Sequence, residues 1–394
     1  MKVAVVVTGG LHPSGRDQVV PSWLALFSEL AKTHDIHAFA LRHLPETQTY
    51  SLRGFTVHDL GRPSAAIGLT RWAQARALRR ALAAQGPFDL VHGLWGDPAG
   101  QLAVRSARGF GIPSLVTLDS GEFVSIPVID YGSQRTARGR TAIKEACGAT
   151  RIHVCTRFMA DKAAQHGVQP AVIPLTTVTS SPAATADGAE QAELKFRPPG
   201  RVRVGGDGGP LKLLQVASLS RVKNQQMLID ALAIVRQSVD ARLDLVGEDT
   251  LGGELQRRAG EKGVGEHVRF LGFVPQDRLA ATFADADLYV QSSLHEAAGV
   301  SVLEAAASGL PIVGTRVGYV ADWAPDRALA IDTGDPSALA QAILTLHGDP
   351  LRAREMAARA QSWALEHHAG WVADRFTLLY RDAAGATPSP STAG

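Results

Sequence analysis

Two glutamates separated by seven residues, Glu296 and Glu304, form the richest chemical pattern in the 394-residue chain. The sequence predicts a strand before them and a helix that opens at Gly299, so the amides of Gly299, Val300 and Ser301 would point at an anion. Glu304, about one turn inside that helix, could accept hydrogen bonds from two vicinal hydroxyls. One carboxylate on each side of an anion suits a diphosphate that carries a sugar at one end and a ribose at the other. The alternative is a helix with two solvated glutamates.

Two further motifs carry weaker signals. Gly10 and Gly15 have the spacing of a phosphate-binding loop, but the Lys-Ser/Thr pair that would hold phosphate and magnesium is missing. Ligand contact at Gly10 and a purely structural turn therefore stay equally open. Asp285 and Asp287 could hold a divalent cation with a diphosphate, but no third ligand is near, so we expect surface carboxylates and no metal site.

The elements that must position these residues alternate between short apolar strands and longer helical patterns. In the first part of the chain, strands are expected at 3–7, 36–40, 56–59, 89–92, 114–118, 152–155 and 171–174, with helices at 20–33 and 69–84. In the second part, strands are expected at 211–218, 241–246, 268–272, 287–291 and 311–314, with helices at 225–238, 254–262, 300–308 and 336–346. This alternation predicts βαβ units and parallel sheets.

The fold class that follows is α/β, with two doubly wound, Rossmann-like domains facing a central cleft. The expected segments are a first domain at 1–177, a flexible linker at 178–210, a second domain at 211–369, a C-terminal helix at 370–383 that crosses back to the first domain, and a disordered tail at 384–394. The linker and the tail are inferred from their Gly, Pro, Ser and Ala content.

The charge of the chain argues against nucleic acid as a partner. A net charge of +2 supplies no strong overall field, but residues 1–177 carry 19 Lys and Arg against 12 Asp and Glu, a net +7, which leaves −5 for the rest. A basic first domain could dock on anionic lipid at the inner membrane face or bind an acidic acceptor. Its basic clusters are Arg71, Arg76, Arg79 and Arg80, and Arg135, Arg138, Arg140 and Lys144. A solvated helix face is the alternative that we favour.

Cysteine content and hydropathy bear on the compartment. Cys147 and Cys155 cannot form a disulfide framework, and their spacing matches no common zinc site. No stretch approaches about 18 uninterrupted apolar residues. We therefore expect a cytoplasmic protein.

Several of these motifs together resemble one family. Glu296 and Glu304 with Gly299, the following Ala305-Ala-Ala-Ser-Gly309-Leu-Pro311-Ile-Val, and the upstream Phe270-Leu-Gly-Phe273-Val-Pro275 resemble the second domain of the GT4 family, the retaining glycosyltransferases of GT-B fold. The similarity runs from residue 211 through the helical C-terminus and, more weakly, over 1–174. It implies metal-independent and cofactor-independent transfer of a sugar from a nucleotide-diphosphate donor to an acceptor hydroxyl, on a lipid-linked or a small molecule.

The resemblance also implies roles for single residues. Lys223 matches the lysine that binds the donor diphosphate, where a cation neutralises the charge that develops on the leaving group. Glu296 and the amides at 299–301 would address the sugar and phosphates, and Glu304 would hold the ribose. Gly247, Phe273 and Val274 fall where relatives line the nucleotide. The family arginine five residues before the lysine is Ser218 here, and Arg221 could supply that charge from another position.

The chain departs from the family pattern mainly in its first domain. Asp119 stands where relatives often carry a His-Gly turn that faces the donor sugar, and it could be either a sugar contact with a catalytic role or a turn residue. Ala298 replaces the usual aromatic residue near Glu296. These changes favour an unusual acceptor or donor sugar. The alternatives are a glycosyltransferase-like binding or scaffold module without turnover and, less favoured, another GT-B enzyme such as a sugar-nucleotide epimerase or a phosphorylase.

Overall fold

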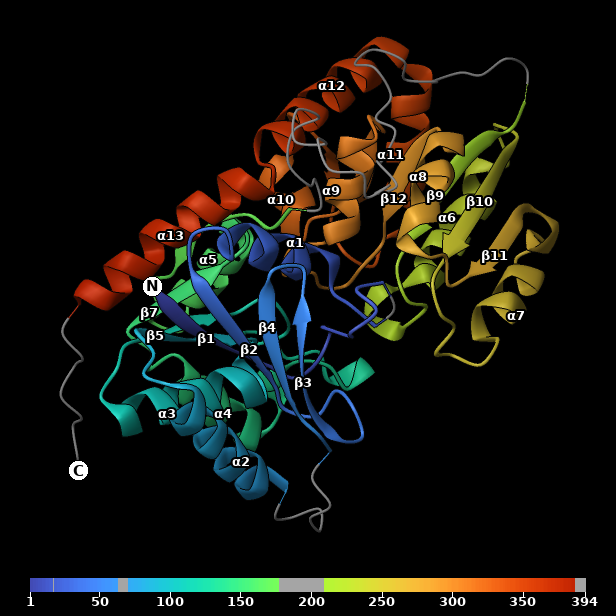
Figure 1. Ribbon diagram of the computed structural model, residues 1–394. Helices are drawn as coiled ribbons and strands as arrows, with labels where there is room; N and C mark the ends of the chain where they lie inside the picture. The colour runs from blue at the N-terminus through green and yellow to red at the C-terminus, as the bar shows by residue number, and fades with distance from the viewer. Residues whose placement is uncertain (17, 63–69, 177–208, 387–394) are drawn as a thin grey trace. The chain divides into compact units, whose positions relative to one another are not determined.

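The computed structural model describes residues 1–16, 18–62, 70–176 and 209–386. The chain divides into two compact units, one formed by Met1–Thr179 with Ala369–Gly394 and the other by Ser180–His368. Nearly all of the linker expected at 178–210, and residues 387–394 of the expected tail, lie outside the described residues. Figure 1 shows the helices and strands with their labels.

The first unit contains a sheet with the strand order β3-β4-β2-β1-β5-β6-β7-β8. Its strands are β1 (Lys2–Val7), β2 (Asp35–Ala40), β3 (Thr47–Leu52), β4 (Phe55–Leu60), β5 (Leu90–Leu94), β6 (Ser114–Thr117), β7 (Arg151–Val154) and β8 (Ala171–Val172). All pair in parallel except β3, which pairs antiparallel with β4 at the edge. The sequence does not predict β3, because a mostly exposed edge strand of polar residues lacks an apolar pattern.

Helices surround this sheet. They are α1 (Pro21–Leu30), α2 (Thr70–Gln85), α3 (Gln101–Phe110), α4 (Ala137–Ala146), α5 (Arg157–Ala164) and α13 (Ala369–Gly385). The C-terminal helix α13 groups with the first unit and packs against α1. It begins one residue before and ends two residues after the predicted 370–383, so the first residues of the expected tail are helical.

A chain of buried hydrogen bonds joins α13 to the first sheet. His153 Nε2 donates to the carbonyl of Ile173 at 2.9 Å, which leaves His153 Nδ1 to accept from the Thr117 hydroxyl at 3.0 Å. Thr117 in turn accepts from His92 Nε2 at 2.8 Å, and His92 Nδ1 accepts from the Tyr380 hydroxyl at 3.0 Å. Burial lowers the pKa of His153 to about 4 and holds the pKa of His92 well below its ordinary value, so both rings are neutral. The direction of each bond is therefore fixed.

The second unit contains a fully parallel sheet with the order β11-β10-β9-β12-β13-β14. Its strands are β9 (Leu211–Val216), β10 (Ala241–Val246), β11 (Val268–Gly272), β12 (Leu288–Gln291), β13 (Ile312–Thr315) and β14 (Leu329–Ile331). In chain order this is the 3-2-1-4-5-6 arrangement of dinucleotide-binding folds, and the strand order reverses between β9 and β12. Ligands of such sheets bind outside the carboxyl ends of the strands at this point.

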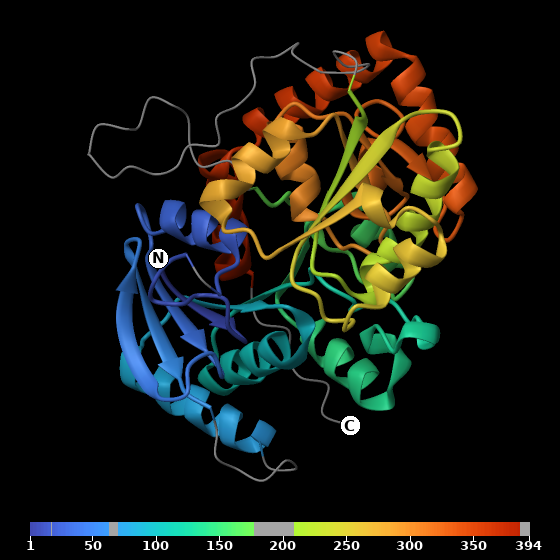
Figure 2. The same ribbon diagram turned by 90° about the vertical axis from the view of Figure 1, so that its right-hand side faces the viewer.

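Helices lie on both sides of the second sheet, as Figure 2 shows. They are α6 (Gln225–Val235), α7 (Glu254–Glu261), α8 (Gln276–Asp285), α9 (Val300–Ala307), α10 (Gly318–Trp323), α11 (Pro336–Gly348) and α12 (Pro350–Glu366). The predicted strands and helices of this unit are present, with ends that differ by a few residues. The sequence did not predict α8, α10 or β14. Within the described residues no helix has the length and apolarity needed to cross a bilayer.

Candidate functional site

The loops after β9 and β12 lie against each other at the point where the strand order reverses. The amide of Leu294 donates to the carbonyl of Val222 at 2.8 Å, and the Ser292 hydroxyl donates to the carbonyl of Lys223 at 2.9 Å. Ser292 in turn accepts from Gln215 Nε2 at 3.2 Å. These bonds fix the backbone that carries the two charged side chains of the site.

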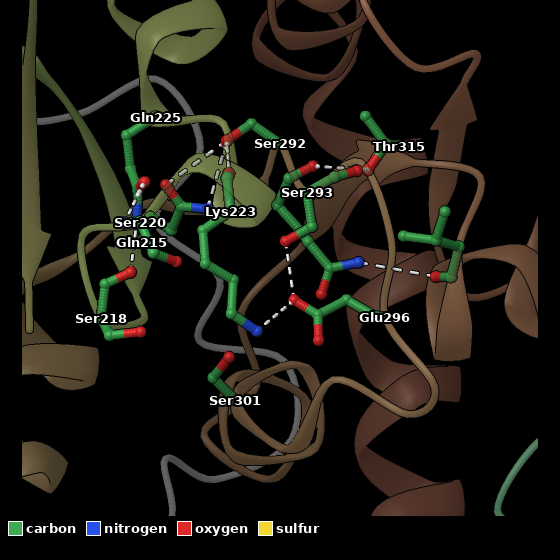
Figure 3. Close-up of polar contacts among 12 residues, drawn as sticks. Gln215, Ser218, Ser220, Lys223, Gln225, Ser292, Ser293, Glu296, Ser301 and Thr315 are labelled. Atoms are coloured by element: carbon green, nitrogen blue, oxygen red, sulfur yellow. Dashed lines mark hydrogen bonds and ion pairs between the residues drawn. The ribbon is translucent and has the colours of Figure 1, made fainter. Parts of the chain in front are cut away.

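Lys223 and Glu296 form an ion pair in this position. Lys223 Nζ lies 2.6 Å from Glu296 Oε1, and the two side chains are 24% and 12% exposed. The Ser293 hydroxyl donates to the same carboxylate oxygen at 2.6 Å. Figure 3 shows Lys223 extending toward the β12 loop, with its ammonium against Glu296 and near Ser301. The structure thus brings together Lys223 and Glu296, two of the three residues with predicted catalytic roles.

The helix α9 begins beside this ion pair. Gly299 precedes it with φ of 87°, and a Cβ there would lie 2.8 Å from Gln291 Oε1, so glycine is the residue that this turn accepts. No side chain among the described residues caps α9, which leaves the first amides, at Val300 and Ser301, with the positive end of the helix dipole. The Ser301 hydroxyl accepts from Tyr289 at 2.6 Å. This arrangement is suited to binding an anion.

Glu304 is a buried carboxylate further along α9. Glu304 is 4% exposed. Its Oε1 accepts a 2.7 Å hydrogen bond from Nε2 of Gln276, the first residue of α8. Burial raises the pKa of Glu304 to about 7, against the opposing effect of the Gln276 amide. The sequence did not predict a role for Gln276 or Ser293. Gln276 lies 28 residues from Glu304, so no local spacing connects them, whereas Ser293 follows a buried strand and could have been noted.

The loops after β10 and β11 complete this edge of the sheet. Gly247 has φ of 146°, and a Cβ on it would lie 2.0 Å from the carbonyl oxygen of Ala217. Its amide donates to Gly272 at 2.8 Å. Phe273 follows with 67% of its surface exposed, and Val274 is partly buried. Three loops therefore approach closely here, and an exposed aromatic ring stands beside them.

Arg221, the possible replacement for the family arginine, forms an ion pair with an acidic residue of α7. Its guanidinium lies 3.0 Å from Glu254 of α7, and both side chains are exposed, so it is engaged outside the Lys223 and Glu296 pair.

Asp285 and Asp287, the acidic pair considered as a metal motif, also contact other residues. Asp285 contacts Lys212 at 2.6 Å, and Asp287 accepts from the Lys212 amide at 2.9 Å. Among the described residues no three His, Cys, Asp or Glu side chains are placed to share a metal ion.

The remaining predicted residues belong to the first unit. Gly10 has φ of 87° in the loop after β1, and its carbonyl accepts from Val20 at 3.0 Å, as expected for a structural turn. Asp119 follows β6, is partly buried, and hydrogen-bonds the Cys155 thiol, whose pKa is raised by burial and by that carboxylate.

Two family models match the chain. Residues 200–363 match glycosyl transferases group 1, and residues 19–176 match the glycosyl transferase 4-like domain. The chain is 27% identical to the GDP-mannose-dependent alpha-(1-6)-phosphatidylinositol monomannoside mannosyltransferase of Mycolicibacterium smegmatis, over 92% of this chain and 94% of that one. It is 28% identical to a D-inositol 3-phosphate glycosyltransferase of Pseudarthrobacter chlorophenolicus, over 73% and 68%.

Solved structures show the same architecture. Sucrose-phosphate synthase from Thermosynechococcus elongatus superposes with a TM-score of 0.76 at 18% identity, over 97% of this chain and 98% of that one. HepE from Anabaena in complex with UDP-glucose gives 0.72 at 17% identity, over 97% and 100%. These likenesses show the fold, and the two family models cover both halves of the chain. The chain therefore belongs to the GT4-type, group 1 glycosyltransferases and has the GT-B fold.

Proposed function

We propose that this glycosyltransferase moves a hexosyl group from a nucleotide-diphosphate sugar to an acceptor hydroxyl, with retention of configuration and without a metal ion. The observation that carries the proposal is the ion pair of Lys223 and Glu296 beside the uncapped start of α9, where the strand order reverses. The names of relatives support the class of donor, since one is GDP-mannose-dependent, and HepE has been solved with UDP-glucose.

The donor diphosphate would bind at the first amides of α9. It would replace Glu296 as the ion-pair partner of Lys223. Lys223 needs only to move its ammonium, because the β9 and β12 loops are joined through their backbones. Glu296 would then remain held by Ser293 and accept hydrogen bonds from the donor sugar. The ribose hydroxyls would bind the Glu304 carboxylate. Gln276 donates to Oε1, so Oε2 would accept from the ribose.

In the transfer step the bond between the sugar C1 and the diphosphate oxygen breaks, and C1 bonds to the acceptor oxygen on the same face. The acceptor proton passes to the departing diphosphate. Lys223 and the α9 dipole stabilise the charge that develops on the leaving group, which is the term expected to contribute most to the rate.

Nucleotide release from a panel of UDP-, GDP- and ADP-sugars tests this function. Lys223→Ala should lower kcat/KM by about 100-fold or more, in the range seen when one stabilising donor is removed from a transition state. Lys262→Ala removes an exposed lysine whose nearest carboxylate, on Asp230, is 3.8 Å away, and serves as the matched control. Equal activity of the two variants would contradict the proposal. Donor binding without release in any assay would favour the binding module without turnover.

We also propose that α2 contacts anionic lipid. Trp72 is 62% exposed, and the Arg76 guanidinium lies 5.3 Å from the centre of its ring, while Arg80 follows one turn later. Arg71 does not contribute, because it pairs with Asp97. Sedimentation with phosphatidylglycerol vesicles should retain the wild-type chain and lose an Arg76→Glu, Arg80→Glu variant, and binding that both share would refute this contact.

A further inference from the structure

A buried tyrosine of the second sheet contacts the first turn of α9. Tyr289 is 1% exposed, and it belongs to β12, a strand that pairs with β9 on one side and with β13 on the other. Its amide donates to the carbonyl of Pro311 at 3.0 Å, and its ring lies against that of Phe283 with the ring centres 6.2 Å apart. The backbone and the ring of Tyr289 are therefore both held in place. The sequence predicts no role for this residue.

The Tyr289 hydroxyl donates to the side chain of Ser301, the second residue of α9. The two oxygens are 2.6 Å apart. The backbone of Val216, at the end of β9, is a further hydrogen-bond partner of the phenol oxygen. Burial and the nearby carboxylates of Glu296 and Glu304 raise the pKa of Tyr289, so the phenol stays protonated. Because a phenol has one hydrogen, that hydrogen is committed to Ser301.

This bond determines which way the Ser301 hydroxyl points. A serine hydroxyl has one hydrogen and two lone pairs, and here one lone pair accepts from Tyr289. The hydrogen of Ser301 must therefore point away from Tyr289. Within the described residues the Ser301 side chain makes no other hydrogen bond, and Ser301 is half-buried. Its hydrogen is thus available to a ligand, and a hydroxyl that already accepts a hydrogen bond is a stronger donor.

A ligand that reaches this hydroxyl meets positive charge. The ammonium of Lys223 points toward the start of α9, as Figure 3 shows. The Ser301 amide is also one of the uncapped amides in the first turn of α9, where the helix dipole is positive. An oriented hydroxyl hydrogen, uncapped amides and a cation all favour the oxygens of a diphosphate over a neutral or cationic group.

We propose that Tyr289 is a positioning residue for the donor diphosphate and that it acts through Ser301. Because Tyr289 uses the Ser301 oxygen as its acceptor, the Ser301 hydrogen stays directed at the phosphate oxygens. The side chain of Ser301 then donates to the diphosphate in addition to its amide. The alternative is that the bond only satisfies a buried phenol and stabilises the unit. The inference rests on the proposed glycosyltransferase function and extends it to the hydroxyl groups of these two residues.

Calorimetric titration of the full chain with UDP, GDP and ADP tests the inference. Tyr289→Phe keeps the ring and removes the hydroxyl, so the Ser301 hydrogen is free to turn away from the phosphate. Affinity for the nucleoside diphosphate should fall by about tenfold or more, as loss of a hydrogen bond to a charged group does. Ser301→Ala removes the donor itself and should have a similar effect. Tyr380→Phe, the matched control, removes the hydroxyl of a buried tyrosine in the first unit and should leave this affinity unchanged.

The double variant separates positioning from a purely structural role. If Tyr289 acts through Ser301, the combination of Tyr289→Phe with Ser301→Ala should bind the diphosphate no more weakly than Ser301→Ala alone. If the phenol only stabilises the unit, the losses of the two single variants should add, or Tyr289→Phe should lower the Tm without changing the affinity. Either of these results would overturn the inference.

The same titrations distinguish a failure of this inference from a failure of the proposed function. Binding of a nucleoside diphosphate that depends on Lys223 but not on Tyr289 would leave the proposed function standing and remove the role of Tyr289. Failure of the wild-type chain to bind any of the three nucleotides would contradict both.

Discussion

Replacing Glu304 by glutamine should stabilise the second unit while weakening its binding of the donor. Glu304 is 4% exposed, and burial raises its pKa from the ordinary 4.5 to about 7. That difference corresponds to roughly 3 kcal/mol of unfolding free energy, at about 1.4 kcal/mol for each pKa unit. Glutamine has the same shape, and its carbonyl oxygen can still accept the hydrogen bond from Gln276.

The sign of the effect follows from where the proton is bound. Between pH 4.5 and about 7 the folded chain keeps a proton on Glu304 that the unfolded chain has released. Stability of the wild-type chain is therefore lost as pH rises through this window, whereas the glutamine side chain does not titrate. The variant should gain up to about 3 kcal/mol at pH 8, and the gain should vanish toward pH 4.5.

Thermal and urea unfolding at pH 5 and pH 8 measure this gain. A domain of 150–250 residues shifts its Tm by about 2–4 °C per kcal/mol, so the Tm of the variant should rise by roughly 6–12 °C at pH 8. Glu266→Gln, at an exposed position, is the control and should give no comparable rise. In the same samples UDP- and GDP-sugars should bind more weakly to Glu304→Gln. A stability gain that is equal at both pH values, or absent at pH 8, would refute the argument from charge burial.

The remaining predictions concern the buried chain to α13, the glycine between loops, and metal ions. Tyr380→Phe removes the donor to His92 Nδ1 and should lower the unfolding free energy by about 1–3 kcal/mol in a urea titration. Gly247→Ala places a Cβ 2.0 Å from the Ala217 carbonyl oxygen and should abolish nucleotide binding, while an unchanged affinity would show that the loops can separate. Chelation of divalent cations should leave the transfer rate unchanged within about twofold, and a tenfold loss would contradict a metal-independent mechanism.

The arrangement of residues 299–304 could be predicted from the sequence because these residues are close together in the chain. Gly299 and Glu304 lie within one turn and helix, and the helical pattern alone sets their spacing along α9. Lys223 was placed by resemblance, and its contact with Glu296 depends on two strands that are far apart in the chain. The contact of Arg221 with Glu254 could not be predicted in this way, because Glu254 lies on another helix and no local spacing connects the two residues.

The packing of the loops after β5 and β6 could not be predicted from the sequence, because contacts outside the helices and strands create it. Gly121, Gly132 and Gly139 are unremarkable in the sequence, and their role appears only when the atoms that a Cβ would meet are known. Glu122 likewise looks like a surface residue of a polar turn, although it accepts hydrogen bonds from two separate loops. The edge strand β3 was missed for a related reason, since its stability comes from pairing with β4 rather than from apolar burial.

The two edges of the second sheet differ in a way that itself points to a ligand. At the edge where the strands begin, carboxylates have cationic partners, as Asp285 has in both Lys212 and Arg242. At the opposite edge Glu296 pairs with Lys223, but α9 starts without a side-chain cap, and Glu304 is buried with no cationic partner among the described residues. An arrangement selected for stability alone would place a capping side chain at α9 and a neutral residue at 304. Both features lower the stability of the unit at the edge where a diphosphate would bind the α9 amides and a ribose would bind Glu304. We therefore expect the most stabilising substitutions at this edge to weaken donor binding.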